Sequence, residues 1–125
     1  MKFSTKAEYG LRAIIYLAKS KKSVSLASIA KQEGLSLAYL ERLFALLKKA
    51  ELITSYKGVK GGYTLIRPAS KITVAQIIKA LEGDLYQIKC DSCDVCQCLI
   101  HPVWLKLYKQ INKTLDSITL KSLIK

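Results

Sequence analysis

The chain has 125 residues, half of them hydrophobic, and a formal net charge of +12. This length predicts a single domain with at most a short appendage, and no apolar run approaches the roughly 20 residues of a membrane-spanning helix. The charge is uneven, because residues 1–67 hold 13 Lys and Arg against 4 acids, whereas residues 68–125 hold 8 against 5. We therefore expect a polyanion to bind the N-terminal half and no membrane to be involved; a merely solvated basic surface is the alternative.

The first predicted element is a helix that begins at Ser4 or Thr5 and ends near Ala18. Its apolar residues recur at helical spacing around more than one side, which indicates a buried helix. Thr5 is followed three positions later by Glu8, a spacing typical of a capping box. A polar, basic link then leads to the next helix, for which Ser25 is the predicted N-cap.

Two short helices joined by a tight turn at Gly34 follow, and the second starts at Ser36. This arrangement is typical of a helix-turn-helix, whose second helix enters the major groove of DNA. There Arg42 would pair with guanine, Glu41 with cytosine, and Tyr39 would reach a phosphate or a thymine methyl group. Packing of two helices without DNA is the alternative. The predicted DNA-contacting positions on this recognition helix are Ser36, Ala38, Tyr39, Glu41 and Arg42.

The segment after the helix pair reads as a β-hairpin with strands at Ile53–Tyr56 and Tyr63–Ile66. Its turn is rich in glycine and carries two lysines, which predicts the wing of a winged-helix domain. Glycines let the backbone approach DNA closely, and the lysines can meet phosphates or the minor groove. The predicted contacts in the wing are Lys57, Gly58, Lys60 and Gly61. A further helix, capped by Thr73 and ended by Gly83, follows the wing.

All four cysteines lie within nine residues, and the only histidine comes three residues after the last of them. Thiolate and imidazole ligands favour iron–sulfur clusters, zinc or copper(I) over magnesium or calcium. A segment this polar is poorly suited to a core, whereas a disulfide framework would fit a secreted protein. The first 18 residues lack the apolar stretch of a secretion signal, so we expect a cytoplasmic protein with reduced thiols. The predicted metal-ligating residues are Cys90, Cys93, Cys96, Cys98 and His101.

The last long helix is predicted from Val103 to about Leu115, with Pro102 at its first position. The positive end of its dipole would then point at the cysteine thiolates. Its apolar residues, among them Trp104 and Leu107, exceed what one small domain can cover. We expect a two-fold homodimer that sets two recognition helices one or more DNA turns apart, with packing inside one chain as the alternative.

Together these motifs resemble the Rrf-two family of bacterial winged-helix transcriptional regulators, the group that includes IscR, NsrR and CymR. The resemblance covers essentially the whole chain: residues 1–14, the helix at 35–53, the GxxGGYxL wing at Gly58–Leu65, the helix at 72–83 and the closing segment at 118–124. It implies a mostly α fold with a small β-hairpin wing, in which a winged helix-turn-helix domain precedes a long C-terminal dimerisation helix. It also implies a homodimer that reads a palindromic operator in double-stranded DNA.

Several members of this family bind an iron–sulfur cluster through three cysteines and one further ligand. By this resemblance Cys90 and Cys98 occupy the outer cysteine positions, because CLIHPVWLKL matches the family pattern of a cysteine, two residues, a histidine and a tryptophan-bearing helix. The loop is shorter than usual and offers both remaining cysteines as the third ligand, with Cys93 slightly favoured over Cys96. The favoured fourth ligand is His101, as in IscR-type members, and the alternative is Glu8 of the partner subunit, as in some NsrR-like members. A 2Fe-2S cluster is favoured, with 4Fe-4S as the alternative.

The sequence thus predicts a regulator and not an enzyme, because it offers no nucleophile–base–carboxylate set and no phosphate-cradling loop between strand and helix. The expected organisation is a DNA-binding domain at 1–83, a cluster-binding loop at 84–101, and a dimerisation helix with a C-terminal segment at 102–125. Binding, oxidation or loss of the cluster would reorder the loop and alter the relation between the two recognition helices. A thiol–disulfide redox sensor and a zinc-stabilised DNA-binding or interaction protein are the alternatives.

Overall fold

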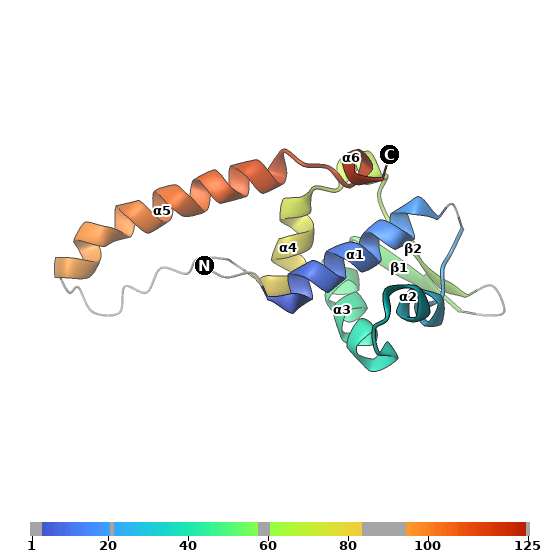
Figure 1. Ribbon diagram of the computed structural model, residues 1–125. Coiled ribbons are helices and arrows are strands. Elements are labelled where there is room, and N and C mark those ends of the chain that lie inside the picture. The colour runs from blue at the N-terminus through green and yellow to red at the C-terminus, as the bar shows by residue number, and fades with distance from the viewer. Residues whose placement is uncertain (1–3, 21, 58–60, 84–94, 125) are drawn as a thin grey trace.

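The computed structural model describes residues 4–20, 22–57, 61–83 and 95–124, with the backbone only for residues 95–98. Helices dominate, and two strands form an antiparallel hairpin (Figure 1), which confirms the predicted fold class. The elements in chain order are α1 (Thr5–Lys19), α2 (Leu26–Glu33), α3 (Leu37–Lys49), β1 (Ile53–Tyr56), β2 (Gly62–Leu65), the 3-10 helix η1 (Ala69–Lys71), α4 (Val74–Glu82), α5 (Val95–Asp116) and α6 (Leu120–Leu123). Within the described ranges, no helix has the length and apolar character needed to cross a membrane.

The helix-turn-helix is set locally by serine caps and one glycine. Ser25 Oγ accepts a hydrogen bond from the backbone N–H of Ser28 at 3.2 Å, and Ser36 Oγ accepts one from Tyr39 at the same distance. Gly34 ends α2 with a φ of 67°, a left-handed conformation that glycine adopts without steric cost. The predicted caps and the predicted turn are therefore confirmed.

The start of α1 differs from the predicted capping box. Ser4 is the N-cap, and its hydroxyl accepts from the backbone N–H of Lys6 at 3.2 Å. Thr5 is already the first helical residue, and its hydroxyl lies 3.5 Å from that of Tyr39. The predicted pairing of Thr5 with Glu8 is wrong, because a residue inside the helix cannot occupy the capping position, and Glu8 is exposed on the first turn.

A complete capping box lies instead at the start of α4. Thr73 Oγ1 accepts from the backbone N–H of Gln76 at 3.2 Å, and Gln76 Oε1 accepts from that of Thr73 at 3.1 Å. Gly83 forms the C-cap of the same helix. Both predicted limits of this helix are confirmed.

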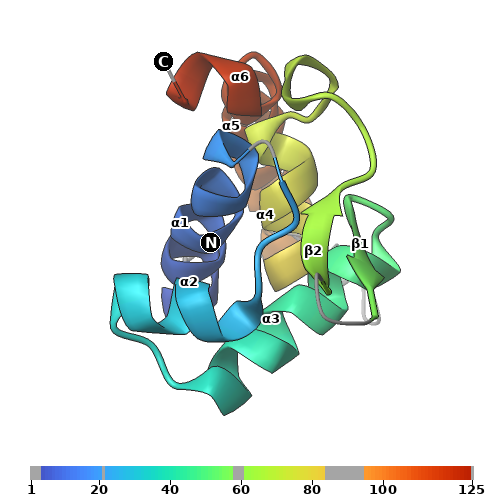
Figure 2. The same cartoon turned by 90° about the vertical axis from the view of Figure 1, so that its right-hand side faces the viewer.

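The hairpin is extended by a third strand-like segment from the link between α1 and α2. Ile53 pairs with Leu65 in the hairpin, whose second strand begins one residue before the predicted start. Val24 exchanges both backbone hydrogen bonds with Tyr63, at 3.0 and 2.8 Å. A Cβ at Gly62 would lie 2.5 Å from the carbonyl oxygen of Val24, so only glycine fits beside this link. The wing is therefore fixed to the helical part of the fold, as Figure 2 shows from the side.

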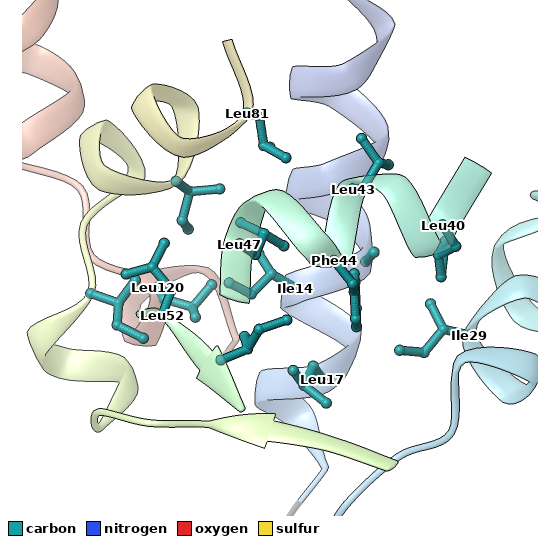
Figure 3. Close-up of a cluster of buried hydrophobic side chains, with 14 of the residues drawn as sticks. Ile14, Leu17, Ile29, Leu40, Leu43, Phe44, Leu47, Leu52, Leu81 and Leu120 are labelled. Atoms are coloured by element: carbon teal, nitrogen blue, oxygen red, sulfur yellow. The ribbon is translucent and has the colours of Figure 1, made fainter. Parts of the chain in front are cut away.

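One hydrophobic core joins α1, α2, α3, α4, α6 and the base of the hairpin (Figure 3). The apolar residues that recur along α3 at helical spacing are buried, except that Leu37 is 46% exposed because it lies in the first turn, beyond the core. The rings of Phe44 and Tyr63 form a T-shaped contact with a centroid distance of 5.0 Å and an interplanar angle of 80°. The largest fully buried side chains are Phe44, Ile14, Leu17, Ile29, Leu40, Leu43, Leu47, Leu52, Ile53, Ile72, Ile77 and Leu120.

The end of the described chain returns to this core. The backbone N–H of Val74 donates to the carbonyl of Ile118, and that of Leu120 donates to the carbonyl of Ile72, both at 2.8 Å. Thr73 and Thr119 form an isolated antiparallel bridge between these bonds. The side chain of Leu120 is fully buried, so α6 completes the core of the winged-helix domain.

The long helix α5 starts earlier than predicted. It begins at Val95, and Pro102 lies inside it instead of at its first position. The preceding residues, VCQCLIH, contain no helix breaker, so the helix extends upstream of the proline although Pro102 cannot donate a hydrogen bond to the carbonyl of Cys98. The prediction that the positive dipole end lies at Pro102 is therefore wrong, and that end lies at Val95, within the cysteine-rich segment.

The two halves of α5 have different surroundings. Leu115 packs with Ile118 against Val74 and Ile78 of α4. The first half extends away from the core (Figure 1). The exposed large apolar side chains on this projecting half are Leu99, Ile100, Val103, Trp104 and Leu107.

Candidate DNA-binding surface and cysteine segment

The recognition helix α3 presents a polar side to solvent because its apolar residues recur every three or four positions and face the core. Four of the positions predicted from the sequence are exposed on its N-terminal side. Ser36 caps the helix, Ala38 lies in its first turn, and Glu41 and Arg42 follow. This arrangement leaves a carboxylate and a guanidinium free to meet groups outside the chain.

Tyr39, the remaining predicted position on α3, has a different environment. Its side chain is half-buried, and its ring packs edge-to-face on that of Tyr9 at a centroid distance of 6.2 Å. Its hydroxyl lies near that of Thr5, also on α1. Tyr39 therefore contacts a neighbouring helix of its own domain.

The wing residues are partly within the described structure. Lys57 is exposed directly after β1, and Gly61 is half-buried directly before β2. The predicted contacts Gly58 and Lys60 lie outside the described residues.

Beside the wing lies an open groove of about 810 Å³, which the sequence reading did not anticipate. Its wall includes one lysine from the last turn of α1, one lysine from the following link, two serines at the start of α2 and one wing glycine: Lys19, Lys22, Ser25, Ser28 and Gly61. The only feature of the sequence that could have indicated this groove is the high density of basic residues around the link. Within the described ranges, the one ion pair joins Arg12 Nε to Glu33 Oε2 at 3.3 Å, so these lysines carry uncompensated charge.

The cysteine segment is described only in part. Cys90 and Cys93 lie outside the described residues, and Cys96 and Cys98 are placed by their backbone in the first two turns of α5. His101 follows on the same helix and is half-buried. No three potential metal ligands come together among the residues whose side chains are described.

The donor set nevertheless fits a soft metal centre by its chemistry. Four thiols and one imidazole are the ligands that iron–sulfur clusters, zinc and copper(I) prefer. Glu8, the alternative ligand, is exposed on α1, and within the described structure it takes part in no hydrogen bond or ion pair. Its carboxylate is thus available to a group outside its own domain.

A helix-turn-helix, a hairpin wing tied to its flank and an uncompensated basic surface define a winged helix-turn-helix DNA-binding protein. The family model Rrf2, described as an iron-dependent transcriptional regulator, matches residues 3–125. The chain belongs to this family, and it is therefore a DNA-binding transcriptional regulator. The regulator IscR of Xenorhabdus nematophila is 37% identical over 131 residues, which cover 100% of this chain and 80% of IscR.

Solved structures agree with this assignment. CymR, the global cysteine regulator of B. subtilis, has a TM-score of 0.81 and 36% identity, and the match covers 99% of this chain and 96% of CymR. IscR of T. potens has a TM-score of 0.79 and 43% identity, covering 99% of this chain and 86% of that protein. These matches agree with the family's description as transcriptional regulators.

Proposed function

We propose that this chain is a homodimeric, cytoplasmic regulator that binds a palindromic operator and whose affinity for DNA is controlled by an iron–sulfur cluster in the cysteine segment. The observation that carries the proposal is the placement of three predicted ligands on one helix with the exposed apolar residues. Cys96, Cys98 and His101 belong to the first turns of α5, and the unpaired apolar side begins at Leu99. A change at the metal centre therefore acts directly on the proposed dimer helix.

In this proposal α3 enters the major groove and the wing contacts the adjacent backbone. Arg42 reads guanine and Glu41 reads cytosine, while Ser36 and Ala38 lie close to the base edges. Lys57, Gly58, Lys60 and Gly61 contact phosphates or the minor groove. The basic groove beside the wing, with Lys19 and Lys22, adds attraction to phosphates that carries no sequence information.

The homodimer is supported by the projecting half of α5. Leu99, Val103 and Leu107 are spaced four residues apart and are 73%, 61% and 43% exposed, with Ile100 and Trp104 beside them. A contiguous apolar stripe of this size on a small domain marks an interaction surface. The same stripe on a second copy, related by a two-fold axis, covers it and places two recognition helices on one operator.

The proposed ligands are Cys90, Cys98, one of Cys93 and Cys96, and His101, or Glu8 of the partner subunit. The cluster would supply reversible redox chemistry and sensitivity to oxidants, nitric oxide or iron supply. Residues 95–98 contribute backbone N–H groups without intrahelical partners, because they form the start of α5. This positive helix end favours the anionic thiolate form of nearby cysteines.

Purification under anaerobic conditions tests the cofactor. The expected result is a brown protein with visible absorption and equal amounts of iron and sulfide. Variants Cys90→Ala and Cys98→Ala should lose this absorption and change DNA binding. If these variants kept both the chromophore and normal DNA binding, the proposal would be wrong.

The two alternatives give different results in the same measurement. A zinc-stabilised protein would be colourless, would contain zinc, and would show no redox response. A thiol–disulfide sensor would bind no iron, and its cysteines would oxidise and reduce reversibly.

A further inference from the structure

Helix α1 contacts both α4 and the recognition helix α3, and α3 also packs directly on α4 (Figure 1). On the α4 side, the hydroxyl of Ser4 donates a hydrogen bond to Glu82 Oε1, and the backbone N–H of Ser4 donates to the same oxygen at 3.3 Å. Ser4 is the N-cap of α1, and Glu82 is the last residue of α4, two positions before the cysteine-rich loop starts. The carboxylate thus ties the start of α1 to the end of α4.

A steric contact strengthens this tie. Gly10 of α1 approaches Leu81 so closely that a Cβ at this position would lie 2.4 Å from Leu81 Cδ1 and 3.2 Å from its Cγ. Leu81 is only 3% exposed and cannot swing into solvent. The last turn of α4 and the first half of α1 therefore move together, because a packed contact of this kind leaves no room for sliding.

On its other side, α1 holds the start of α3. The ring of Tyr9 meets that of Tyr39 at an interplanar angle of 85°, and Thr5 Oγ1 lies 3.5 Å from the Tyr39 hydroxyl. The guanidinium of Arg12 lies 5.8 Å from the Tyr9 ring centroid and pairs with Glu33 at the end of α2. One face of α1 therefore fixes both helices of the helix-turn-helix.

We infer that Glu82 and Tyr39 are positioning residues through which the cysteine segment adjusts the recognition helix inside one protomer. In this link, Glu82 and Leu81 carry a displacement of the end of α4 to α1, and Tyr9 passes it to Tyr39. The inference rests on the proposed function for the change at the cysteine segment that starts the movement. The contacts from Glu82 to Tyr39 belong to the winged-helix domain itself and do not depend on a cluster. It assigns Tyr39 to placing α3 and not to contacting a base or phosphate.

Hydrogen–deuterium exchange of the metal-free protein tests the link independently of any cluster. In Glu82→Ala, the hydrogen-bonded backbone amides of residues 40–42 should exchange at least about 5-fold faster than in the parent, because α1 loses its tie and α3 its support. Glu51→Ala removes the same charge from an exposed site at the end of α3 and should leave residues 40–42 unchanged. Equal exchange of these residues in Glu82→Ala and the parent would overturn the inference.

Tyrosine variants separate positioning from direct DNA contact. The probe is a DNA duplex selected from a random-sequence library by the metal-free parent protein. Tyr39→Phe keeps the ring contact with Tyr9 and should bind this duplex within about 2-fold of the parent, whereas Tyr39→Ala should bind at least about 10-fold more weakly. If both variants lost affinity equally, the hydroxyl would be a DNA contact and the assignment of Tyr39 would be wrong.

A third measurement tests whether this link takes part in regulation. It compares the affinity for the duplex of protein reconstituted anaerobically with iron and sulfide with that of the metal-free protein, as a ratio. Glu82→Ala should bring this ratio at least about 5-fold closer to one. The double variant Glu82→Ala/Tyr39→Ala should give the same ratio as Glu82→Ala alone, because both residues belong to the same link between α4 and α3. A parent ratio of one would overturn the proposed cluster control and leave the exchange result to decide the mechanical link. A parent ratio that Glu82→Ala leaves unchanged would overturn the inference and retain the proposed function.

Discussion

Glu51 occupies a position in the backbone that normally belongs to glycine. Its φ is 61°, and among the described residues it is the one non-glycine residue with a positive φ. It directly follows the C-cap of α3, where its N–H donates to the carbonyl of Lys48 at 3.0 Å. A side chain with a Cβ is strained there, so the recognition helix ends at a locally unfavourable residue.

Replacing Glu51 with glycine should therefore stabilise the protein. The strain relieved exceeds the entropy that glycine adds to the unfolded chain, and the expected gain in the free energy of unfolding is about 0.5 to 1 kcal/mol. Urea denaturation followed by circular dichroism measures it. The matched control is Ala50→Gly, where φ is −80° and no strain is relieved, so this variant should lose stability.

Arg42 is exposed on the recognition helix and should matter to DNA and not to the fold. Arg42→Ala should weaken binding to a specific duplex by about 1 to 3 kcal/mol, or roughly 5- to 150-fold, with unchanged thermal unfolding and unchanged visible absorption. Lys31→Ala, an exposed cation on α2, is a charge-matched control. Equal losses for the two variants would mean that Arg42 contributes only general attraction to phosphate.

At the scale of elements, the short helix α6 contributes to the hydrophobic core although it is only one turn long. It follows the long helix α5, yet its first residue lies in the core of the winged-helix domain between η1 and α1. The bonds from Val74 and Leu120 hold the chain on either side of the Thr73 and Thr119 bridge. The C-terminal segment therefore anchors α5 to the domain that binds DNA.

Truncating Leu120 should destabilise the whole domain. Leu120→Ala leaves a cavity in the core and should lower the free energy of unfolding by about 2 to 5 kcal/mol. Leu123→Ala, on the same short helix but 39% exposed, should change it by less than about 0.5 kcal/mol. Chemical denaturation of both variants makes the comparison, and similar values would show that α6 contributes little to the core.

At the scale of the whole molecule, the described chain consists of a packed winged-helix domain and a helix that projects from it (Figure 1). The apolar side chains on the projecting half of α5 are not buried within a single copy of the chain, so they do not stabilise the monomer. Covering these side chains in a dimer removes apolar surface from water, which favours association.

A charge within this stripe should separate the protomers. Leu107→Glu is expected to convert the dimer to a monomer, measured by size-exclusion chromatography with light scattering, and to weaken operator binding because each monomer holds one half-site. Lys109→Glu changes an exposed residue on the opposite side of α5 and should remain dimeric. A parent protein that is itself monomeric at micromolar concentration would contradict the proposed dimer.

Local signals in the sequence determined most of the fold. Serine and threonine caps, the turn at Gly34 and the 3.6-residue periodicity of α3 act over a few neighbouring residues, so they could be read without knowledge of the tertiary structure. The spacing of the cysteines and His101 likewise indicated a soft metal site by ligand chemistry alone. The family could be recognised from the same motifs.

Two helix starts were misread from local signals, because Pro102 lies inside α5 and Ser4, not Thr5, caps α1. Only the tertiary structure decided features that depend on distant residues. The pairing of Val24 with Tyr63, the burial of Leu120 and the contact of Tyr39 with α1 join residues far apart in the chain. Such contacts are set by how whole elements pack, because close packing selects one arrangement among many that satisfy the same local pattern.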